Sequence, residues 1–184
     1  ILFVATKKQA KGIVAETAAA LNMPFITERW PGGLLTNFAT IRKSIKKMQT
    51  IDKMKENGTF DSLSKRERLQ IDRQRAKLDL NLGSIVKMTR MPEAVFIVDT
   101  GKENIALAEA NKLGIRSFAM NDTNTNPNLV SFPIPSNDDA SKSIQCIMSI
   151  VKTAIAEGLE ERGADQEAKA VEKKEKAKKI TEEK

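Results

Sequence analysis

The sequence has no histidine, no tyrosine and a single cysteine. The absence of histidine excludes every His-based catalytic triad and most general-base schemes near neutral pH. It also removes the usual ligand sets of zinc and copper sites. Cys146 cannot form an internal disulfide, and its place in an apolar helical pattern predicts a buried thiol in a reducing compartment.

Long apolar runs are missing too, since none approaches the roughly 18–20 residues of a membrane span. No signal peptide is recognisable, and the chain opens at Ile1 inside an apparent strand, so we expect a truncated start. Aromatic residues make up 4% and hydrophobic residues 40% of the 184 residues, which predicts a modest aliphatic core. The length favours one domain, or one domain carrying an insertion.

What the sequence does have is positive charge, +7 in total, concentrated in one segment. Residues 36–90 hold 14 basic and 6 acidic side chains, whereas residues 91–158 hold 5 basic and 8 acidic ones. This local excess indicates a polyanionic partner. Residues 159–184 balance at 8 charges of each sign and hold few large apolar side chains, so we expect a frayed helix or a disordered tail there.

Short apolar runs alternate with helical patterns in two parts of the chain, 1–35 and 91–158. This alternation predicts an α/β domain with a mostly parallel sheet and helices on both faces. The expected strands are 1–5, 24–27, 94–98, 115–120 and 130–132, and the expected helices are 8–21, 103–113 and one that opens at Asp138.

Residues 36–90 are predicted to form an inserted basic helical hairpin with a narrow, coiled-coil-like seam. Phe38, Ile41, Ile45 and Met48 recur at spacings of three and four in its first helix. Asn57-Gly58 breaks that pattern, and a second helical run follows from Ser64 to Leu82. Its apolar positions are Leu69, Ile71, Leu78 and Leu82.

The loop from Glu28 to Phe38 holds the only Trp and the only Gly pair of the sequence. Pro31 and Gly32-Gly33 predict a shaped loop, and Thr36 or Asn37 can cap the helix that follows. The Arg29 guanidinium and the Trp30 indole could hold a phosphate and a base or sugar. The alternative is a packed Trp, a structural turn and an exposed Arg, which is the commoner arrangement on chemistry alone.

Two clusters of charged residues each have two possible functions. Lys7, Lys8 and Lys11 cluster at a helix start, where either a bound phosphate or simple solvation would explain them. Four acids at predicted turns and helix starts could hold magnesium, although turn and cap roles are more common for such positions. These acids are Asp99, Asp122, Asp138 and Asp139.

Three functional classes other than RNA binding are possible for a sequence of this kind. A nucleotide-handling α/β enzyme requires a phosphate cradle, and residues 6–12 match neither a dinucleotide fingerprint nor a phosphate loop. A coiled-coil interaction scaffold would use the hairpin as an arm. A membrane surface fits less well, because the apolar seam is needed for helix pairing and large anchoring aromatics are missing.

Several motifs in fixed order resemble the universal S2 family of small-subunit ribosomal proteins. The first is Glu28-Arg29-Trp30 with Gly32-Gly33 and Leu35-Thr36-Asn37-Phe38. The others follow downstream and spread the resemblance from Ile1 to about Gly158. They are Val98-Asp99-Thr100, Glu109-Ala110, Leu113-Gly114-Ile115, Asp122-Thr123-Asn124, Pro133-Ile134-Pro135 and Asn137-Asp138-Asp139-Ala140.

This resemblance implies a flavodoxin-like α/β domain with an inserted hairpin, bound to small-subunit rRNA in the cytoplasm as a structural, non-enzymatic component of the ribosome. It implies neighbouring ribosomal proteins as partners, among them the OB-fold protein S1, and neither a membrane nor a small-molecule substrate. No cofactor is expected apart from structural Mg²⁺ shared with RNA.

The RNA-binding residues predicted from charge, position and resemblance lie in four groups. They are Lys7, Lys8 and Lys11, the loop residues Arg29, Trp30, Thr36 and Asn37, the hairpin residues Arg42, Lys43, Lys46, Lys47, Arg66, Arg68, Arg73 and Arg75, and Arg90. Base-specific readout is not expected, because folded RNA is recognised largely by its shape.

Overall fold

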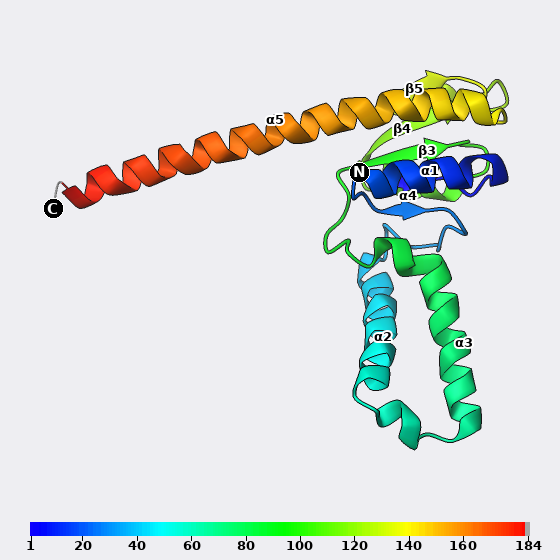
Figure 1. The fold of residues 1–184 in the computed structure, drawn as a ribbon. Coiled ribbons are helices and arrows are strands. Elements are labelled where there is room, and N and C mark those ends of the chain that lie inside the picture. The colour runs from blue at the N-terminus through cyan, green and yellow to red at the C-terminus, as the bar shows by residue number, and fades with distance from the viewer. Residues whose placement is uncertain (183–184) are drawn as a thin grey trace.

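The computed structural model describes the backbone of residues 1–182 and the side chains of residues 1–163. Five parallel strands form one sheet in the order β2-β1-β3-β4-β5 (Figure 1). This order is that of flavodoxin-like folds, which confirms the predicted fold class. The strands are β1 (Leu2–Val4), β2 (Phe25–Ile26), β3 (Ala94–Val98), β4 (Arg116–Asn121) and β5 (Phe132–Pro135).

The helices follow the predicted order along the chain. They are α1 (Lys8–Ala20), α2 (Phe38–Glu56), α3 (Lys65–Leu82), α4 (Asn104–Lys112) and α5 (Ser141–Glu182), with short 3-10 turns η1 (Thr59–Ser62), η2 (Gly83–Ile85) and η3 (Pro127–Leu129). No helix within the described part of the chain is both long and apolar enough to cross a membrane.

The last strand differs from the prediction, because β5 lies at Phe132–Pro135 rather than at 130–132. It contains Pro133 and Pro135, which a central strand would not tolerate. The Ser136 N–H donates to the Asn121 carbonyl of β4, so the amides of alternate residues 132, 134 and 136 face the neighbouring strand. The proline nitrogens therefore face the open edge of the sheet, where no hydrogen-bond donor is needed.

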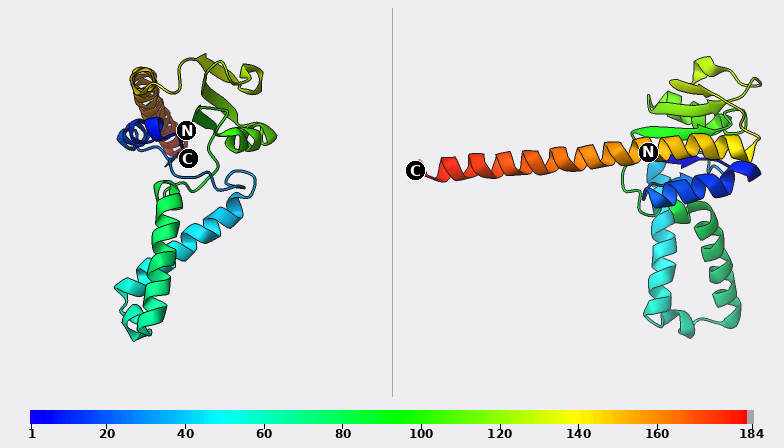
Figure 2. Two further views of the ribbon diagram at one scale, coloured as in Figure 1. Left: turned by 90° about the vertical axis from the view of Figure 1, so that its right-hand side faces the viewer. Right: turned by 45° about the horizontal axis from the view of Figure 1, so that its top comes forward.

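The sheet is covered on both faces by separate apolar clusters. On one face, α1 and α5 contribute Val14, Ala18, Ile144 and Met148 against Phe96 of β3 and neighbouring strand residues. On the other face lies α4 (Figure 2). Its apolar residues pack together with residues from the loop after β2 and from the base of the hairpin. The base of the hairpin is thus part of the same core as the sheet.

The hairpin formed by α2, η1 and α3 projects from the α/β domain (Figure 1). Ile45, Met48 and Ile51 are the buried face of α2. The start of α3 is fixed by a capping box, in which the Ser64 and Glu67 side chains satisfy each other's backbone N–H groups.

One predicted seam residue of α3 is misplaced. Leu69 was expected to pack between the hairpin helices, but its side chain is 52% exposed. Ile71 and Leu78 are half-buried, and Leu82 is buried. At 100° per residue Leu69 lies on the opposite side of α3 from Ile71 and Leu78, so one helix cannot turn both toward α2.

Helix α5 begins at Ser141, three residues later than predicted. Asp138 is buried in the loop before it, and the Asn137 Oδ1 accepts hydrogen bonds from the Asp139 and Ala140 N–H groups of that loop. The prediction of a buried Cys146 is wrong, since the thiol is exposed. Ile144 and Met148 are four residues apart on the buried face, which places Cys146 between them on the opposite face.

The predicted tail, 159–184, continues α5 as helix through Glu182. Its side chains from residue 164 on, and residues 183 and 184 altogether, lie outside the described part of the structure. Fraying of this segment stays a prediction.

Two isoleucines of α5 test how that helix is held to the sheet. Ile144 is fully buried, whereas Ile150 is 64% exposed on the same helix. We expect Ile144→Ala to lower the free energy of unfolding by about 2–5 kcal/mol, because it leaves a cavity against the sheet. Ile150→Ala should change it by less than about 0.5 kcal/mol in the same chemical denaturation experiment. Equal losses for the two variants would contradict the described packing of α5.

Candidate nucleic-acid interface

A single buried carboxylate, Glu109 of α4, organises the loop between β2 and the hairpin. Its Oε1 accepts hydrogen bonds from the Trp30 Nε1–H at 3.0 Å and the Gly33 N–H at 2.7 Å. Its Oε2 accepts from the Leu35 N–H at 3.0 Å and from the Thr36 N–H and Oγ1–H at 3.1 and 3.2 Å. Five donors on one loop therefore converge on one side chain.

Glu109 remains charged because of these donors. Burial of the carboxylate acts to raise its pKa, but the hydrogen bonds from Trp30, Thr36, Gly33 and Leu35 outweigh burial and hold the pKa below its ordinary value. A buried ionised carboxylate is tolerated only where donors surround it, as they do here. Sequence analysis missed this role, although an acid beside the apolar Ala106 and Ala110 of α4 was a usable signal.

We call Glu109 and its five hydrogen bonds to the loop the Glu109 clamp. It decides whether Trp30 contacts RNA or packs in the core. The indole is buried and its N–H is held by Glu109, so Trp30 packs in the core and cannot stack on a base, contrary to its place among the predicted RNA contacts. Gly33 has φ of +83°, and a Cβ there would lie 3.3 Å from the Asn37 Cβ, so this glycine is required by the turn.

Thr36 and Asn37 lie at the surface at the start of α2. Asn37 is the N-cap residue, as proposed, but its Oδ1 accepts from the Thr40 hydroxyl rather than from a backbone amide. Arg29 is exposed beside this loop. The loop therefore presents Arg29 and Asn37 outward, whereas the Trp30 indole and the hydroxyl of the exposed Thr36 hold it to Glu109.

Lys7 is embedded in carboxylates at the carboxyl end of the sheet. Its Nζ lies 2.7 Å from Asp138 Oδ1, 2.6 Å from Asp139 Oδ1 and 3.3 Å from Asp99 Oδ2. Partial burial acts to lower the pKa of Lys7, but hydrogen bonds to Asp138 and Asp139 and the charges of Asp138 and Asp99 outweigh it and raise the pKa above its ordinary value. Lys7 is therefore an internal counter-ion, a role that sequence analysis did not foresee.

Three of the four aspartates considered as a magnesium site pair with this lysine, and the fourth, Asp122, lies beside Asp138 and Asp139. Carboxylate oxygens of Asp122, Asp138 and Asp139 lie within 4.8 Å of one another, close enough to surround a cation. Asp99 has a left-handed backbone, with φ of 68°, and its Oδ1 accepts from the Lys102 N–H. The Lys7 ammonium already supplies one positive charge to this group.

This arrangement bears on nucleotide binding, because ligands of such sheets bind where the strand order reverses, here between β1 and β3. At this point the N–H and hydroxyl of Thr6 donate to the Glu103 carboxylate, which is itself buried. An internal carboxylate thus occupies the donors that a phosphate would need, and the neighbouring aspartates would repel one.

The three lysines near the start of α1 do not form one cationic cluster. Lys8 is exposed, and Lys11 pairs with Glu28 of the loop after β2 at 2.9 Å. Since Lys7 points into the aspartates, only Lys8 of the three is an exposed cation without an ion-pair partner among the described residues.

Three predicted arginines of the hairpin have structural contacts. Arg75 bridges Asp52 of α2 at 2.9 Å and Asp79 of α3 at 3.0 Å, which raises its pKa. Arg42 Nη1 donates to the Met88 carbonyl at 3.1 Å and so ties the start of the hairpin to its end. Arg68 lies 3.8 Å from Asp61.

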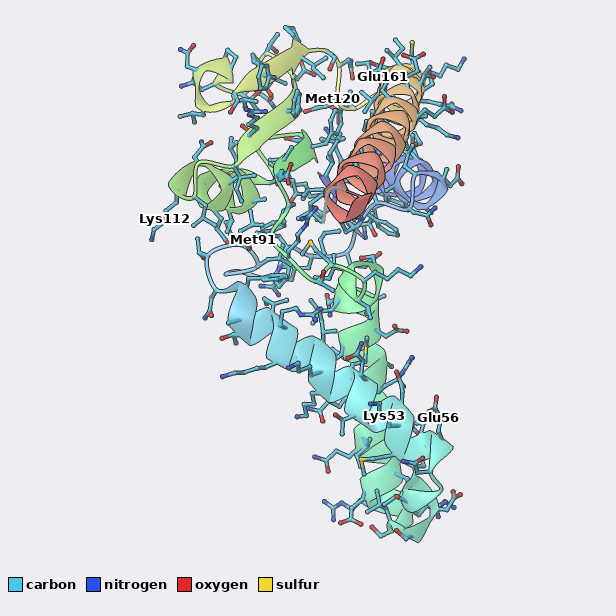
Figure 3. All side chains as sticks on the ribbon, turned by 90° about the vertical axis from the view of Figure 1, so that its left-hand side faces the viewer. Lys53, Glu56, Met91, Lys112, Met120 and Glu161 are labelled. Carbon is cyan, nitrogen blue, oxygen red and sulfur yellow. The ribbon has the colours of Figure 1, made fainter. Side chains whose placement is uncertain are left out.

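The remaining predicted hairpin cations are exposed and have no ion pair within the described side chains. They are Lys43, Lys46 and Lys47 of α2, Arg66 and Arg73 of α3, and Arg90 before β3. Lys53, which was not predicted, continues the α2 set toward the distal end of that helix (Figure 3). At 100° per residue the four α2 lysines share the side opposite Ile45, Met48 and Ile51, so they form one basic face.

Fold and site together define a class. It is an α/β protein that carries a basic helical hairpin and that fills the carboxyl ends of its strands with its own charged side chains. Residues 1–158 match the family described as Ribosomal protein S2. The chain therefore belongs to the ribosomal protein S2 family.

Curated relatives named small ribosomal subunit protein uS2 agree with this assignment. The protein of Flavobacterium johnsoniae is 64% identical over 172 residues, covering 94% of this chain and 68% of the relative. That of Flavobacterium psychrophilum is 66% identical, covering 91% and 63%. That of Parabacteroides distasonis is 62% identical, covering 90% and 59%. The chain thus spans about three fifths to two thirds of the length of these relatives.

The Glu109 clamp predicts a large effect of a nearly isosteric substitution. Glu109→Gln replaces one accepting oxygen by an NH₂ group that faces backbone donors, so at least one buried donor loses its partner. We expect the free energy of unfolding at neutral pH to fall by about 2–4 kcal/mol, measured by urea denaturation.

The pH dependence provides a second readout. Because the folded pKa of Glu109 lies below its ordinary value of 4.5, its stabilising contribution is fully present above about pH 4.5 and is lost as the pH falls through the folded pKa. The stability difference between wild type and Glu109→Gln should therefore shrink only in acid. Glu157→Gln, at an exposed position of α5, is the control and should show no such difference.

Proposed function

We propose that this chain is a structural, non-enzymatic component of the small ribosomal subunit in the cytoplasm, and that it binds small-subunit rRNA through the basic face of α2. The observation that carries the proposal is the set of exposed lysines Lys43, Lys46, Lys47 and Lys53 on the side of α2 opposite its buried seam. Phosphate oxygens are the ligands that such a lysine face suits. The names of the curated relatives support the choice of the ribosome.

The α/β domain contributes rigid placement in this proposal. The Glu109 clamp fixes the loop from which α2 departs, and Arg42 fixes the return of the chain at Met88. Arg29, Thr36, Asn37, Lys8 and Arg90 would add contacts beside the hairpin, whereas Lys7 and Arg75 act as internal counter-ions. The proposal includes no cofactor other than Mg²⁺ shared with RNA.

Contacts to neighbouring small-subunit proteins are also part of the proposal, with the OB-fold protein S1 as one candidate. The nucleotide-enzyme alternative loses support because Glu103 and the aspartates around Lys7 fill the edge where a phosphate would bind.

The α2 face can be tested by charge removal. In the triple variant Lys43→Gln, Lys46→Gln, Lys47→Gln, we expect weaker binding to purified small-subunit rRNA, because phosphate contacts are lost. The slope of log K against log salt should decrease by about two to three, since each contact contributes somewhat less than one. Filter binding over a salt series measures both quantities.

The matched control removes the same charge elsewhere. Lys112, Lys142 and Lys152 are exposed and lie outside the hairpin, on α4 and α5. Replacing these three by Gln should leave the salt slope within error of wild type. If the two triple variants lose affinity and slope equally, net charge rather than the α2 face governs binding, and the assignment fails.

Association with the ribosome itself can be measured by sedimentation of cell lysate through a sucrose gradient. We expect the protein to migrate with the small subunit at low salt and to be released only at high salt, as expected of a peripheral RNA-bound protein. A free species at low salt would contradict the ribosomal proposal.

A further inference from the structure

The outer side of α3 carries a second, unused helix-packing seam. Residues 66, 69, 73, 76 and 80 follow one another at alternating spacings of three and four, the spacing of coiled-coil seam positions. The side chains in this series are Arg66, Leu69, Arg73, Ala76 and Leu80, and all are exposed. Leu69 is 52% and Leu80 66% exposed, although they lie only about 16 Å apart along the helix.

This seam is separate from the one that holds the hairpin together. The inner seam of α3 consists of Ile71, Arg75, Leu78 and Leu82, and it faces α2, where Arg75 pairs with Asp52. At 100° per residue the two seams lie on nearly opposite sides of α3. A single exposed leucine needs no explanation. Two leucines and an alanine that are exposed together at coiled-coil spacing, with no helix packed against them, do need one.

The outer seam is positively charged, and the acids of α3 do not compensate it. Glu67 is engaged with Ser64 in the capping box, Asp72 pairs with Lys55 at 2.6 Å, and Asp79 pairs with Arg75 at 3.0 Å. Arg66, Arg73 and the adjacent Lys77 have no ion pair among the described side chains. A partner of this surface must therefore be negatively charged.

RNA and a second copy of this chain fit the seam less well. On the lysine face of α2, which we propose binds phosphates, the exposed positions between the lysines are polar, as at Gln49 and Thr50. Leucines in a seam register add nothing to phosphate binding. A second hairpin would bring together two segments that each carry 14 basic and 6 acidic residues.

We propose that the outer seam of α3 docks an amphipathic helix of a neighbouring protein, with apolar residues opposite Leu69, Ala76 and Leu80 and with Asp or Glu opposite Arg66 and Arg73. Left-handed coiled-coil packing places carboxylates within reach of such arginines. The hairpin then carries RNA on α2 and a protein helix on α3.

The test uses a synthetic peptide of about three heptads, with Leu at the seam positions and Glu at the flanking positions, labelled for fluorescence anisotropy. We expect saturable binding to the full chain, weakened at least tenfold in the double variant Leu69→Gln, Leu80→Gln. The control is Leu113→Gln, Leu129→Gln, which alters two leucines that are 45% and 56% exposed outside the hairpin. The control variant should bind like wild type.

Three results would overturn the proposal: no saturable binding of the acidic peptide, equal loss in both double variants, or equal binding of a peptide that carries Lys in place of Glu. Circular dichroism and thermal melting establish that the variants are folded, which their exposed positions favour.

In assembled particles, a photocrosslinker distinguishes a contact with protein from a contact with RNA. This second experiment rests on the proposed function. With p-benzoylphenylalanine in place of Leu80 we expect an adduct to a protein in purified small subunits, and with the same group in place of Thr50 an adduct to rRNA. An RNA adduct alone at position 80 would overturn the docking proposal. Failure of the chain to enter particles would count against the proposed function, and the peptide measurement would then decide the docking proposal by itself.

Discussion

The arrangement of this protein depends on one buried carboxylate. Glu109 gathers a tryptophan N–H, three backbone amides and a hydroxyl from the loop after β2, and that loop leads directly into α2. Because all five donors come from the loop and the acceptor comes from α4, the clamp joins two segments separated by more than 70 residues. The direction in which the hairpin leaves the sheet is set at this junction, together with the apolar contacts of Leu34, Leu35 and Ile85.

The charges at the carboxyl ends of the strands are largely paired within the chain. At the carboxyl edge of the sheet, aspartates surround Lys7 and Glu103 binds the Thr6 donors, so the position that serves other α/β sheets as a ligand site is filled from within. The hairpin, in contrast, carries a concentration of exposed cations without an ion pair among the described side chains, lysines on α2 and arginines on α3, whereas the α/β domain has only scattered ones such as Lys8 and Lys112. In the proposed function, the domain acts as a rigid support and the inserted hairpin makes the contacts with RNA.

Much of this could be predicted from the sequence. The continuous apolar run 94–98 is β3, the 3.6-residue patterns gave α1, α2, α3 and α4 within a few residues, and the parallel α/β class followed from their alternation. The predicted roles of individual side chains failed where residues distant in the sequence surround the side chain in the fold. Trp30 was assigned to RNA although Glu109 holds it in the core, Lys7 was grouped with Lys8 although three aspartates hold it, and Leu69 was placed in the wrong seam.

By itself, the sequence determined most of the secondary structure, the fold class and the location of the basic segment, because periodicity and charge are local properties of the chain. Tertiary structure alone decided which charges are free. Ion pairs such as Lys7 with Asp138 and Arg75 with Asp52 join residues far apart in sequence. The local sequence around a lysine or arginine therefore does not identify the acid that it will pair with. The same holds for Glu109, since its five donors converge only after the sheet has brought α4 beside the loop.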